Sequence, residues 1–364
     1  MRKYFKFFAL SFLAILILWY FGSSLDWAEV WKSLGRANAL QLGVATLIIC
    51  FGYLLRAFRW RTLLAPITPS NLRDLFATTT IGFAAVFLFG RAGEVVRPLW
   101  LPLRDPKVRP SAALVTIGIE RICDLLAIAL LFALNLLWFR APAGREAEFV
   151  LVNRAGIIML AGTFGAVVAL FIFQYFADPI IGWFERRLTG IKFIPQRLTK
   201  LFLSLLKNLA TSLQIFRDPR ELALTIFWTA TLWFAISLPT WLVINAFGLP
   251  FSFSDSLFVM GWAVVGSLVP TPGGAAGAFH ATTAAALVFM GVNRSDAAAV
   301  AIVMHLVYFA PALIFGVYYF LHGDITWERL RTLVIPSDEQ EQQSSVSEVI
   351  ENTKLRSAQS VSPN

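Results

Sequence analysis

Charged residues are scarce in this chain of 364 residues: Asp, Glu, Lys and Arg make up 15% of it, whereas 57% is hydrophobic. Soluble domains carry about 25% charged and about 45–50% apolar residues, so the composition excludes an ordinary soluble protein. Basic residues outnumber acidic ones and give a formal net charge of +9. Because the lysines and arginines lie between apolar segments, this excess favours a membrane surface with anionic inner-leaflet lipids as partners, and we expect no nucleic acid.

Cysteine is also scarce, and familiar catalytic signatures are missing. Cys50 and Cys123 lie inside apolar runs without a CxxC pair, which argues against a disulfide framework and a zinc site. The sequence has no HExxH, GxSG or GxGD motif, and no lysine follows its Gly-rich turn as a nucleotide P-loop requires. We therefore expect neither a cofactor nor an enzyme.

Long apolar segments dominate the sequence and predict an all-α polytopic membrane protein with about seven to nine membrane segments. A full span needs about 20 residues, but the segments 75–90 and 256–270 are shorter and run into Gly/Pro-rich sequence. We assign 1–336 to the membrane domain and 337–364, which is rich in Ser, Gln and Glu, to a disordered cytoplasmic tail. The apolar segments are 7–22, 40–55, 75–90, 111–139, 155–177, 222–247, 256–270, 273–292 and 297–321.

The distribution of Lys and Arg predicts the topology, since cytoplasmic loops are enriched in them. Five lie in 91–110 and eight in 178–221, but none lies in 248–255. If every segment crossed the membrane, both basic loops would be external. If 75–90 enters from the cytoplasm and turns back, every basic loop is cytoplasmic. We therefore predict a re-entrant hairpin there, and a multi-pass protein of the cell (inner) membrane with both termini cytoplasmic.

The second short segment gives the two halves of the chain related patterns. Residues 256–292 either cross the membrane twice or form a re-entrant hairpin from the outside. Two short Gly/Pro-interrupted segments are typical of an inverted repeat with a site between them, here with halves of roughly 40–139 and 222–321. Between the halves, the cytoplasmic segment 178–221 contains an apolar stripe over 197–216 that predicts an amphipathic helix. This helix lies either on the inner leaflet or against the bundle as a connector.

Charged side chains inside an apolar segment are informative because they are expensive to bury. The segment 111–139 contains Glu120, Arg121 and Asp124. The two carboxylates share a helix face at i, i+4, and Arg121 reaches Asp124 at i, i+3. These residues either clamp neighbouring helices together or line a substrate cavity.

A second charged cluster follows the first short segment. Arg91, Glu94 and Arg97 are three residues apart, so one helical turn aligns them, and the glycines around Arg91 permit a turn of the chain. At the tip of a hairpin, two arginines and a carboxylate form a compact cationic site, and the planar arginine fork binds phosphate with two hydrogen bonds. The alternative is a cytoplasmic loop whose side chains extend to the membrane interface.

The second short segment ends in a Gly/Pro turn that cannot continue a helix. The first amides of the next segment are unpaired there and are suited to meet an anion. His280 and His305 stand alone on apolar faces, and we interpret them as core residues. The turn consists of Pro270, Thr271, Pro272, Gly273 and Gly274.

Four of these stretches, in this order, resemble the lysylphosphatidylglycerol synthase transmembrane-region family, whose members are also called flippase-like domain proteins. The stretches are the Arg/Trp-rich residues 54–61, the arginine-glycine-glutamate motif in 90–97, the charged cluster in 120–124 and the turn 270–274. The resemblance covers roughly 14–321 and implies the membrane-embedded, lipid-moving part without the soluble aminoacyl-transferase domain. Many members carry a glutamate after the turn, where this chain has Phe279 and His280, so the role of that acid does not transfer.

Together, the resemblance and the charged clusters predict a lipid flippase-like transporter that moves a phospholipid or another phosphate-bearing, lipid-linked substrate between leaflets. In this interpretation Arg91 and Arg97 receive the phosphate, Glu94 holds them in place, and the Gly/Pro turn supplies the opposing gate. The alternative is a non-catalytic scaffold or partner subunit for a lipid or cell-envelope glycan enzyme, which needs no polar cavity. An intramembrane transferase for a lipid-linked substrate is the third class.

Overall fold

The computed structural model describes residues 16, 19–20, 22–23, 25–189, 196–213, 218–269 and 271–323. Within these ranges every regular element is a helix, which confirms the all-α class. The described helices belong to the unit Met1–Leu321, and of the unit His322–Asn364 the structure describes only 322 and 323. Most of the predicted segment 7–22 and the whole predicted tail 337–364 therefore lie outside the described residues.

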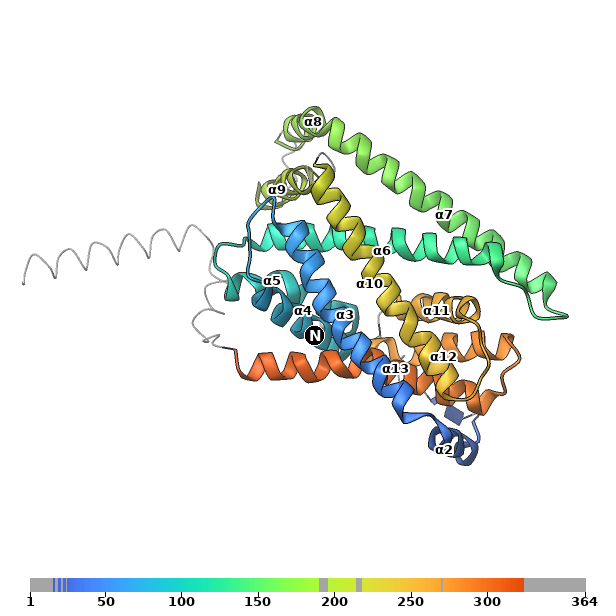
Figure 1. Cartoon of the computed structure of the whole chain (residues 1–364). Helices are drawn as coiled ribbons and strands as arrows, with labels where there is room; N and C mark the ends of the chain where they lie inside the picture. Colours follow the sequence, from blue (N-terminus) through green and yellow to red (C-terminus); the bar gives the residue numbers. More distant parts are fainter. Residues whose placement is uncertain are drawn as a thin grey trace, which may run out of the picture. The chain divides into compact units, whose positions relative to one another are not determined.

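A helix covers most or all of each predicted apolar segment from 40 onwards, and further helices lie in the connections between the segments (Figure 1). In chain order the helices are α2 Trp27–Arg36, α3 Ala39–Leu64, α4 Leu72–Phe89, the 3-10 helix η1 Gly90–Val95, α5 Val96–Arg104, α6 Pro110–Trp138, α7 Glu146–Tyr175, α8 Ala177–Thr189, α9 Gln196–Ser212, α10 Pro219–Ala246, α11 Phe253–Ser267, α12 Pro272–Phe289 and α13 Arg294–Leu321. Those in the connections are α2, η1, α5, α8 and α9. Among the described residues, five stretches are long and apolar enough to cross a membrane, and they lie in α3, α4, α7, α10 and α13. These findings confirm a multi-pass membrane protein, whereas the number of spans stays a prediction.

Local sequence signals set the start of several membrane helices. Asn38, Asp218 and Ser252 precede α3, α10 and α11, and their side-chain oxygens accept hydrogen bonds from backbone N–H groups of the first turn. Ser252 and Asp255 form a reciprocal capping box at the start of α11. Because the first amides of a helix have no partner inside it, these caps stabilise the helix at the residue where it begins.

The two predicted halves of the chain have corresponding packing arrangements. α3 runs antiparallel to α10 (Figure 1): the N–H of Asn38 donates to the carbonyl oxygen of Ala246 at 2.8 Å, and the rings of Phe58 and Trp228 stack 5.0 Å apart. In the first half α4 packs on α13, the last helix of the second half. In the second half α11, the counterpart of α4, packs on α6, the last helix of the first half. α3 and α10 are the first helices of the two halves. Their opposite directions and the matching contacts around them are expected of an inverted repeat.

The first short segment forms a helical hairpin. The chain reverses at Gly90, whose φ of 63° lies in the left-handed region, and η1 and α5 run back along α4. The two arms lie so close that a Cβ added at Gly93 would be 2.3 Å from the carbonyl carbon of Ala85, so this position requires glycine. At the open end of the hairpin, Nε of Arg104 donates to Asp74 at 2.9 Å.

The second short segment forms a hairpin of α11 and α12. Three consecutive residues in its turn, Gly273, Gly274 and Ala275, have positive φ, which confirms the predicted interruption of the helix. Pro270, also expected in this turn, lies outside the described residues.

The tips of the two hairpins are in contact. A Cβ added at Gly90 would lie 2.7 Å from the carbonyl oxygen of Thr271, and α12 packs on both η1 and α4. The two interrupted segments therefore meet at one place in the fold. Their entry from opposite sides of the membrane stays a prediction.

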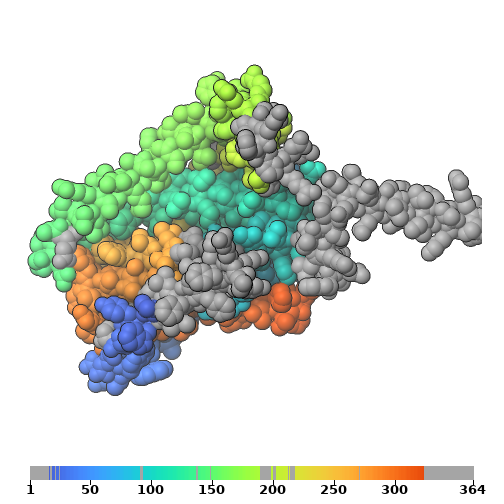
Figure 2. Space-filling model, turned by 180° about the vertical axis from the view of Figure 1, so that it is seen from behind, coloured from blue at the N-terminus to red at the C-terminus, as the bar shows by residue number. Residues whose placement is uncertain are grey.

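The helices between the two halves are more peripheral. α7 packs along α6, and almost none of its apolar stretch is buried (Figure 2). α9 is the predicted amphipathic helix: it packs on α6, and Leu205, Leu209 and Leu213 join a cluster with Leu63. The connector interpretation requires the apolar stripe to pack on the bundle. Only part of the stripe does so, because Leu198 is exposed. A position of the rest on the inner leaflet stays a prediction.

Candidate functional site

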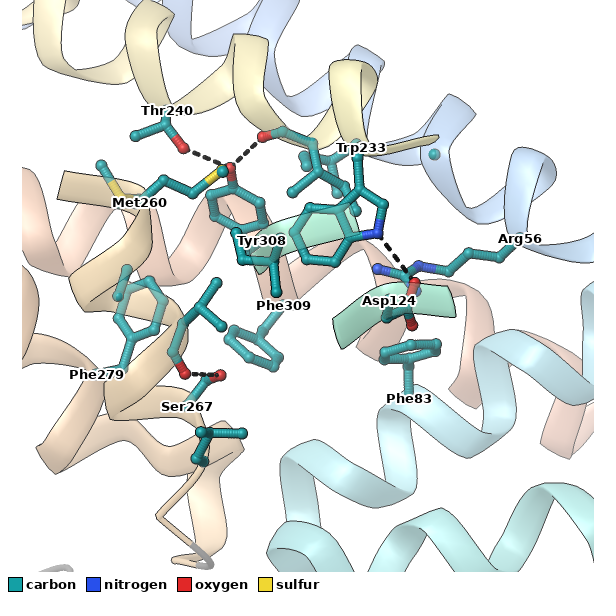
Figure 3. Close-up of a pocket in the computed structure, with 18 of the residues that line it drawn as sticks. Arg56, Phe83, Asp124, Trp233, Thr240, Met260, Ser267, Phe279, Tyr308 and Phe309 are labelled. Carbon is teal, nitrogen blue, oxygen red and sulfur yellow. Dashed lines mark hydrogen bonds between the residues drawn. The ribbon is translucent and has the colours of Figure 1, made fainter. Parts of the chain in front are cut away.

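A cavity of about 370 Å³ lies among α3, α6 and α10–α13, beside both hairpins (Figure 3). One end is charged, because Arg56, Glu94, Arg121 and Asp124 line it. Aromatic and aliphatic side chains with a few hydroxyl groups line the rest. The cavity therefore offers charge and apolar surface in one enclosure, which suits an amphiphilic ligand.

Beneath the charged end, Glu120 receives three arginines. Both terminal nitrogens of Arg97 donate to its carboxylate at 3.2 and 3.0 Å, and Nη2 atoms of Arg59 and Arg121 each lie 3.2 Å from Oε1. The Glu120 side chain is fully buried, with 0% exposed. Since the arginines belong to α3, α5 and α6, Glu120 joins three helices, and the geometry supports the clamp interpretation for this residue.

Asp124 lies one turn further along α6 and lines the cavity. Its Oδ1 accepts from Nη1 of Arg59 at 2.7 Å and from Nε1 of Trp233 in α10 at 3.1 Å. Nη2 of Arg121 lies 3.6 Å from Oδ2, which confirms the predicted contact between these two residues. Arg121 and Asp124 fit both the clamp and the cavity-lining interpretation, because they pair with charged neighbours and also line the cavity.

In the described structure the guanidinium of Arg97 is already occupied and is not free to receive a phosphate as we expected. It is only 3% exposed, its guanidinium lies 4.3 Å from the ring centroid of Trp60, and its fork is occupied by Glu120. Arg97 therefore anchors α5 to α6, and its expected role is corrected accordingly. Glu94 lines the cavity, and the side chain of Arg91 lies outside the described residues.

Arg56 is a cavity residue that the sequence interpretation missed. Its guanidinium lies 4.8 Å from the ring centroid of Phe83 and lines the charged end (Figure 3). It makes no hydrogen bond or ion pair with another residue in the part of the chain that the structure describes. Counting only described side chains, four arginines meet three carboxylates in and beneath the cavity, so one positive charge is uncompensated.

Hydroxyl groups lie further along the cavity and join α3, α10 and α13. Tyr308 Oη lies 2.7 Å from Oγ1 of Thr240 and donates to the carbonyl oxygen of Ile236. Tyr53 Oη donates to the carbonyl oxygen of Tyr308 at 3.0 Å. With Phe279 in the same wall, this part of the cavity is largely aromatic (Figure 3). The sequence interpretation also missed these residues, although hydroxyl groups within apolar segments were a usable signal.

The Gly/Pro turn lies beside the cavity and not in its wall. Thr271, Pro272, Gly273 and Gly274 are absent from the described lining, whereas Ser267 just before the turn belongs to it. An anion at the amides after the turn therefore stays a prediction.

The two histidines pack together below this turn. Their ring centroids are 4.8 Å apart, both are buried as expected of core residues, and Nε2 of His305 lies 3.3 Å from the carbonyl oxygen of Gly274. Within the described ranges, no group of three or more His, Cys, Asp or Glu side chains is placed to hold a metal ion. The absence of a cofactor stays a prediction.

Comparison with known proteins gives two matches that cover most of the chain. Residues 7–316 match the family described as lysylphosphatidylglycerol synthase TM region. The chain is also 22% identical over 333 residues to a UPF0104 membrane protein of Pyrococcus horikoshii, and this alignment covers 87% of the chain and 96% of the relative. The family match agrees with the resemblance carried by the four sequence stretches.

Proposed function

The chain belongs to the lysylphosphatidylglycerol synthase transmembrane-region family, and from this premise we propose that it is a flippase-like transporter. It moves a phosphate-bearing amphiphile, either a phospholipid or a lipid-linked substrate, between leaflets without making or breaking a covalent bond. The observation that supports this most is Arg56, which lines the cavity without an ion-pair partner among the described residues. Because an uncompensated charge inside a membrane is costly, an anionic ligand would stabilise this site.

The lipid phosphate supplies that anion. A phosphate that leaves water must exchange its hydration for charged hydrogen bonds, and Arg56 and Arg121 offer them at one end of the cavity. Asp124 also interacts with Arg121, so the phosphate competes with a carboxylate and is not held irreversibly. The apolar part of the ligand lies along the aromatic wall beside Tyr53 and Tyr308.

In this proposal the protein lies in the inner membrane with both termini cytoplasmic, and anionic inner-leaflet lipids contact the lysines of α9. Lys107, exposed between α5 and α6, tests the orientation. After Cys50 and Cys123 are replaced by alanine, we expect Lys107→Cys to react with a membrane-impermeant maleimide in inside-out vesicles only. Efficient labelling in right-side-out vesicles would contradict the orientation.

The transport proposal is tested by reconstitution with lipids of different head groups. We expect wild-type protein in proteoliposomes to move labelled phosphatidylglycerol and not a neutral glycolipid. Arg56→Gln should slow that movement about tenfold or more, since a hydrogen bond to a charged group contributes about 1.5–3 kcal/mol. Thermal stability should stay at the wild-type value, because Arg56 forms no ion pair with a described residue.

Arg73→Gln is the matched control, since Arg73 is an exposed arginine of α4 outside the cavity. It should leave both lipid movement and stability unchanged. If Arg56→Gln moves lipid at the wild-type rate, Arg56 is not the phosphate site. If wild-type protein moves no lipid, the transport proposal fails. A scaffold or partner subunit for a lipid or envelope-glycan enzyme then becomes the better interpretation, and a covalently altered lipid would indicate a transferase instead.

A further inference from the structure

A second cavity, of about 620 Å³, lies between α6, α7 and α10, and we call it the α6–α7–α10 groove. Its described lining is aliphatic and aromatic and contains no charged side chain; the few polar groups are mainly hydroxyls. Two of these hydroxyls are used within α10, where Thr225 donates to the carbonyl oxygen of Glu221 and Ser237 to that of Trp233. The groove therefore offers hydrocarbon surface and no head-group site.

The dimensions of the groove match one lipid chain. It follows α10 from Leu222 to Ser237, a length of about 22 Å at about 1.5 Å per residue. Half of the hydrocarbon core is about 15 Å thick, so an extended acyl chain of one leaflet fits within this length. α7 forms the outer wall; it packs chiefly along α6, and almost none of its apolar stretch is buried.

Trp233 connects the groove to the charged cavity. Its side chain lines both, and its Nε1 donates to Oδ1 of Asp124 at 3.1 Å. Two adjacent residues of α6 face the two cavities: Asp124 lines the charged cavity and Cys123 lines the groove. The head-group site and the hydrocarbon groove thus meet at one indole side chain.

We propose that the α6–α7–α10 groove binds an acyl chain of the lipid whose phosphate binds at Arg56, and that Trp233 lies at the passage between the two sites. This inference rests on the proposed function. An acyl chain in the groove stays in a hydrocarbon environment while the head group occupies the charged end of the first cavity, and the rest of the apolar part of the lipid lies along the aromatic wall of that cavity.

Ala230→Trp tests the assignment by filling the groove, since Ala230 is exposed on the groove face of α10. Ala169→Trp is the matched control, because Ala169 is exposed on α7 and does not line the groove. With head-group-labelled dioleoyl phosphatidylglycerol in proteoliposomes, we expect Ala230→Trp to lose most lipid movement while still binding glycerol phosphate, and Ala169→Trp to match wild type. Wild-type lipid movement in Ala230→Trp would overturn the proposal.

A cross-linking experiment keeps this proposal separate from the transport proposal. A phosphatidylglycerol with a diazirine in its acyl chain is added to wild-type protein in detergent micelles. We expect cross-links on the groove residues of α6 and α10 that excess dioleoyl phosphatidylglycerol removes by competition and that Ala230→Trp lacks. If such cross-links form but no lipid moves, the groove assignment holds and the transport proposal fails. If lipid moves but cross-links form only outside the groove, the groove assignment fails.

Discussion

The two hairpins have matching places in the fold, but different interactions hold them there. The first, α4 to α5, is tied to α6 by the two hydrogen bonds between Arg97 and the fully buried Glu120. The second, α11 and α12, contains no Asp, Glu, Lys or Arg between 256 and 293. Neutral contacts hold it instead: Ser254 and Asn135 of α6 form two hydrogen bonds of 3.0 and 2.7 Å, and a Cβ added at Gly274 would lie 3.0 Å from the ring of Phe309 in α13.

This difference predicts that one part of the site is fixed and that another part can slide. A buried ion-pair network has one good geometry, and removal of one partner leaves the others as uncompensated charges. Packed apolar surfaces permit small sliding motions at little cost in free energy. We therefore infer that the first hairpin holds the charged end in place and that the second moves against it at the Gly90–Thr271 contact. Substitutions that break the ion pairs of the first hairpin should mainly lower stability, and those at the turn of the second hairpin should mainly change lipid movement.

The largest effect is expected for Glu120→Ala. It leaves Arg59, Arg97 and Arg121 without their shared carboxylate, and breaking such a buried pair costs about 3–5 kcal/mol. We expect little folded protein and a steep fall in the thermal unfolding temperature in detergent. Glu185→Ala is the control, because its pair with Lys207 is exposed and contributes about 1 kcal/mol or less. Wild-type stability of Glu120→Ala would remove the basis of the comparison between the hairpins.

A smaller loss is expected for Arg97→Lys. The ammonium keeps the charge but cannot reproduce the two parallel hydrogen bonds to Glu120 or the position over Trp60, so unfolding should become easier by about 1.5–3 kcal/mol. Denaturant titration of the purified protein measures this loss. Arg56→Lys provides the contrast, with normal stability and slower lipid movement. The opposite pattern, normal stability of Arg97→Lys with slower lipid movement, would support the expected role of Arg97 as a phosphate-binding residue.

The hairpins could be predicted from the sequence because a short apolar run followed by Gly and Pro has few structural solutions inside a membrane. Periodicity within one helix also predicted the contact between Arg121 and Asp124. The partner of Arg97 could not be predicted in this way. Spacing along a segment shows which side chains share a face, whereas the pairing with Glu120 depends on how α5 packs on α6.

Arg56 was missed for a different physical reason. Hydropathy ends the apolar segment at residue 55 because a charge follows, and it therefore leaves Arg56 outside the predicted segment 40–55. Arginine is a good helix former, however, and α3 continues to Leu64 with Trp60 and Leu63 buried. The positive φ of Ala275 was equally hidden, since alanine disfavours that conformation and tertiary contacts must impose it.

In the second hairpin, Gly274→Ala should change transport more than stability. At a φ of 63°, a Cβ costs about 1–2 kcal/mol, and it would also lie 3.0 Å from the ring of Phe309. Gly291→Ala is a matched control, because Gly291 also has positive φ but lies outside the turn with open space around it. Both variants should lose stability from the backbone conformation, with a further loss in Gly274→Ala from the contact with Phe309, and only Gly274→Ala should slow lipid movement. Equal transport in the two would contradict a moving second hairpin.

The smallest effect is expected for His305→Phe. The ring of His305 contacts the turn, where its Nε2 lies 3.3 Å from the carbonyl oxygen of Gly274, and one such hydrogen bond contributes about 0.5–1.5 kcal/mol. Phenylalanine keeps the ring contact with Phe309, so the thermal unfolding temperature should fall only slightly. His305→Gln retains an N–H donor and should return the unfolding temperature to the wild-type value. If the second hairpin is held by close packing, the polar contact at its turn is dispensable for folding, unlike Glu120. A loss of folded protein as large as that of Glu120→Ala would show that polar interactions anchor both hairpins, and the division into a fixed and a moving part would then be wrong.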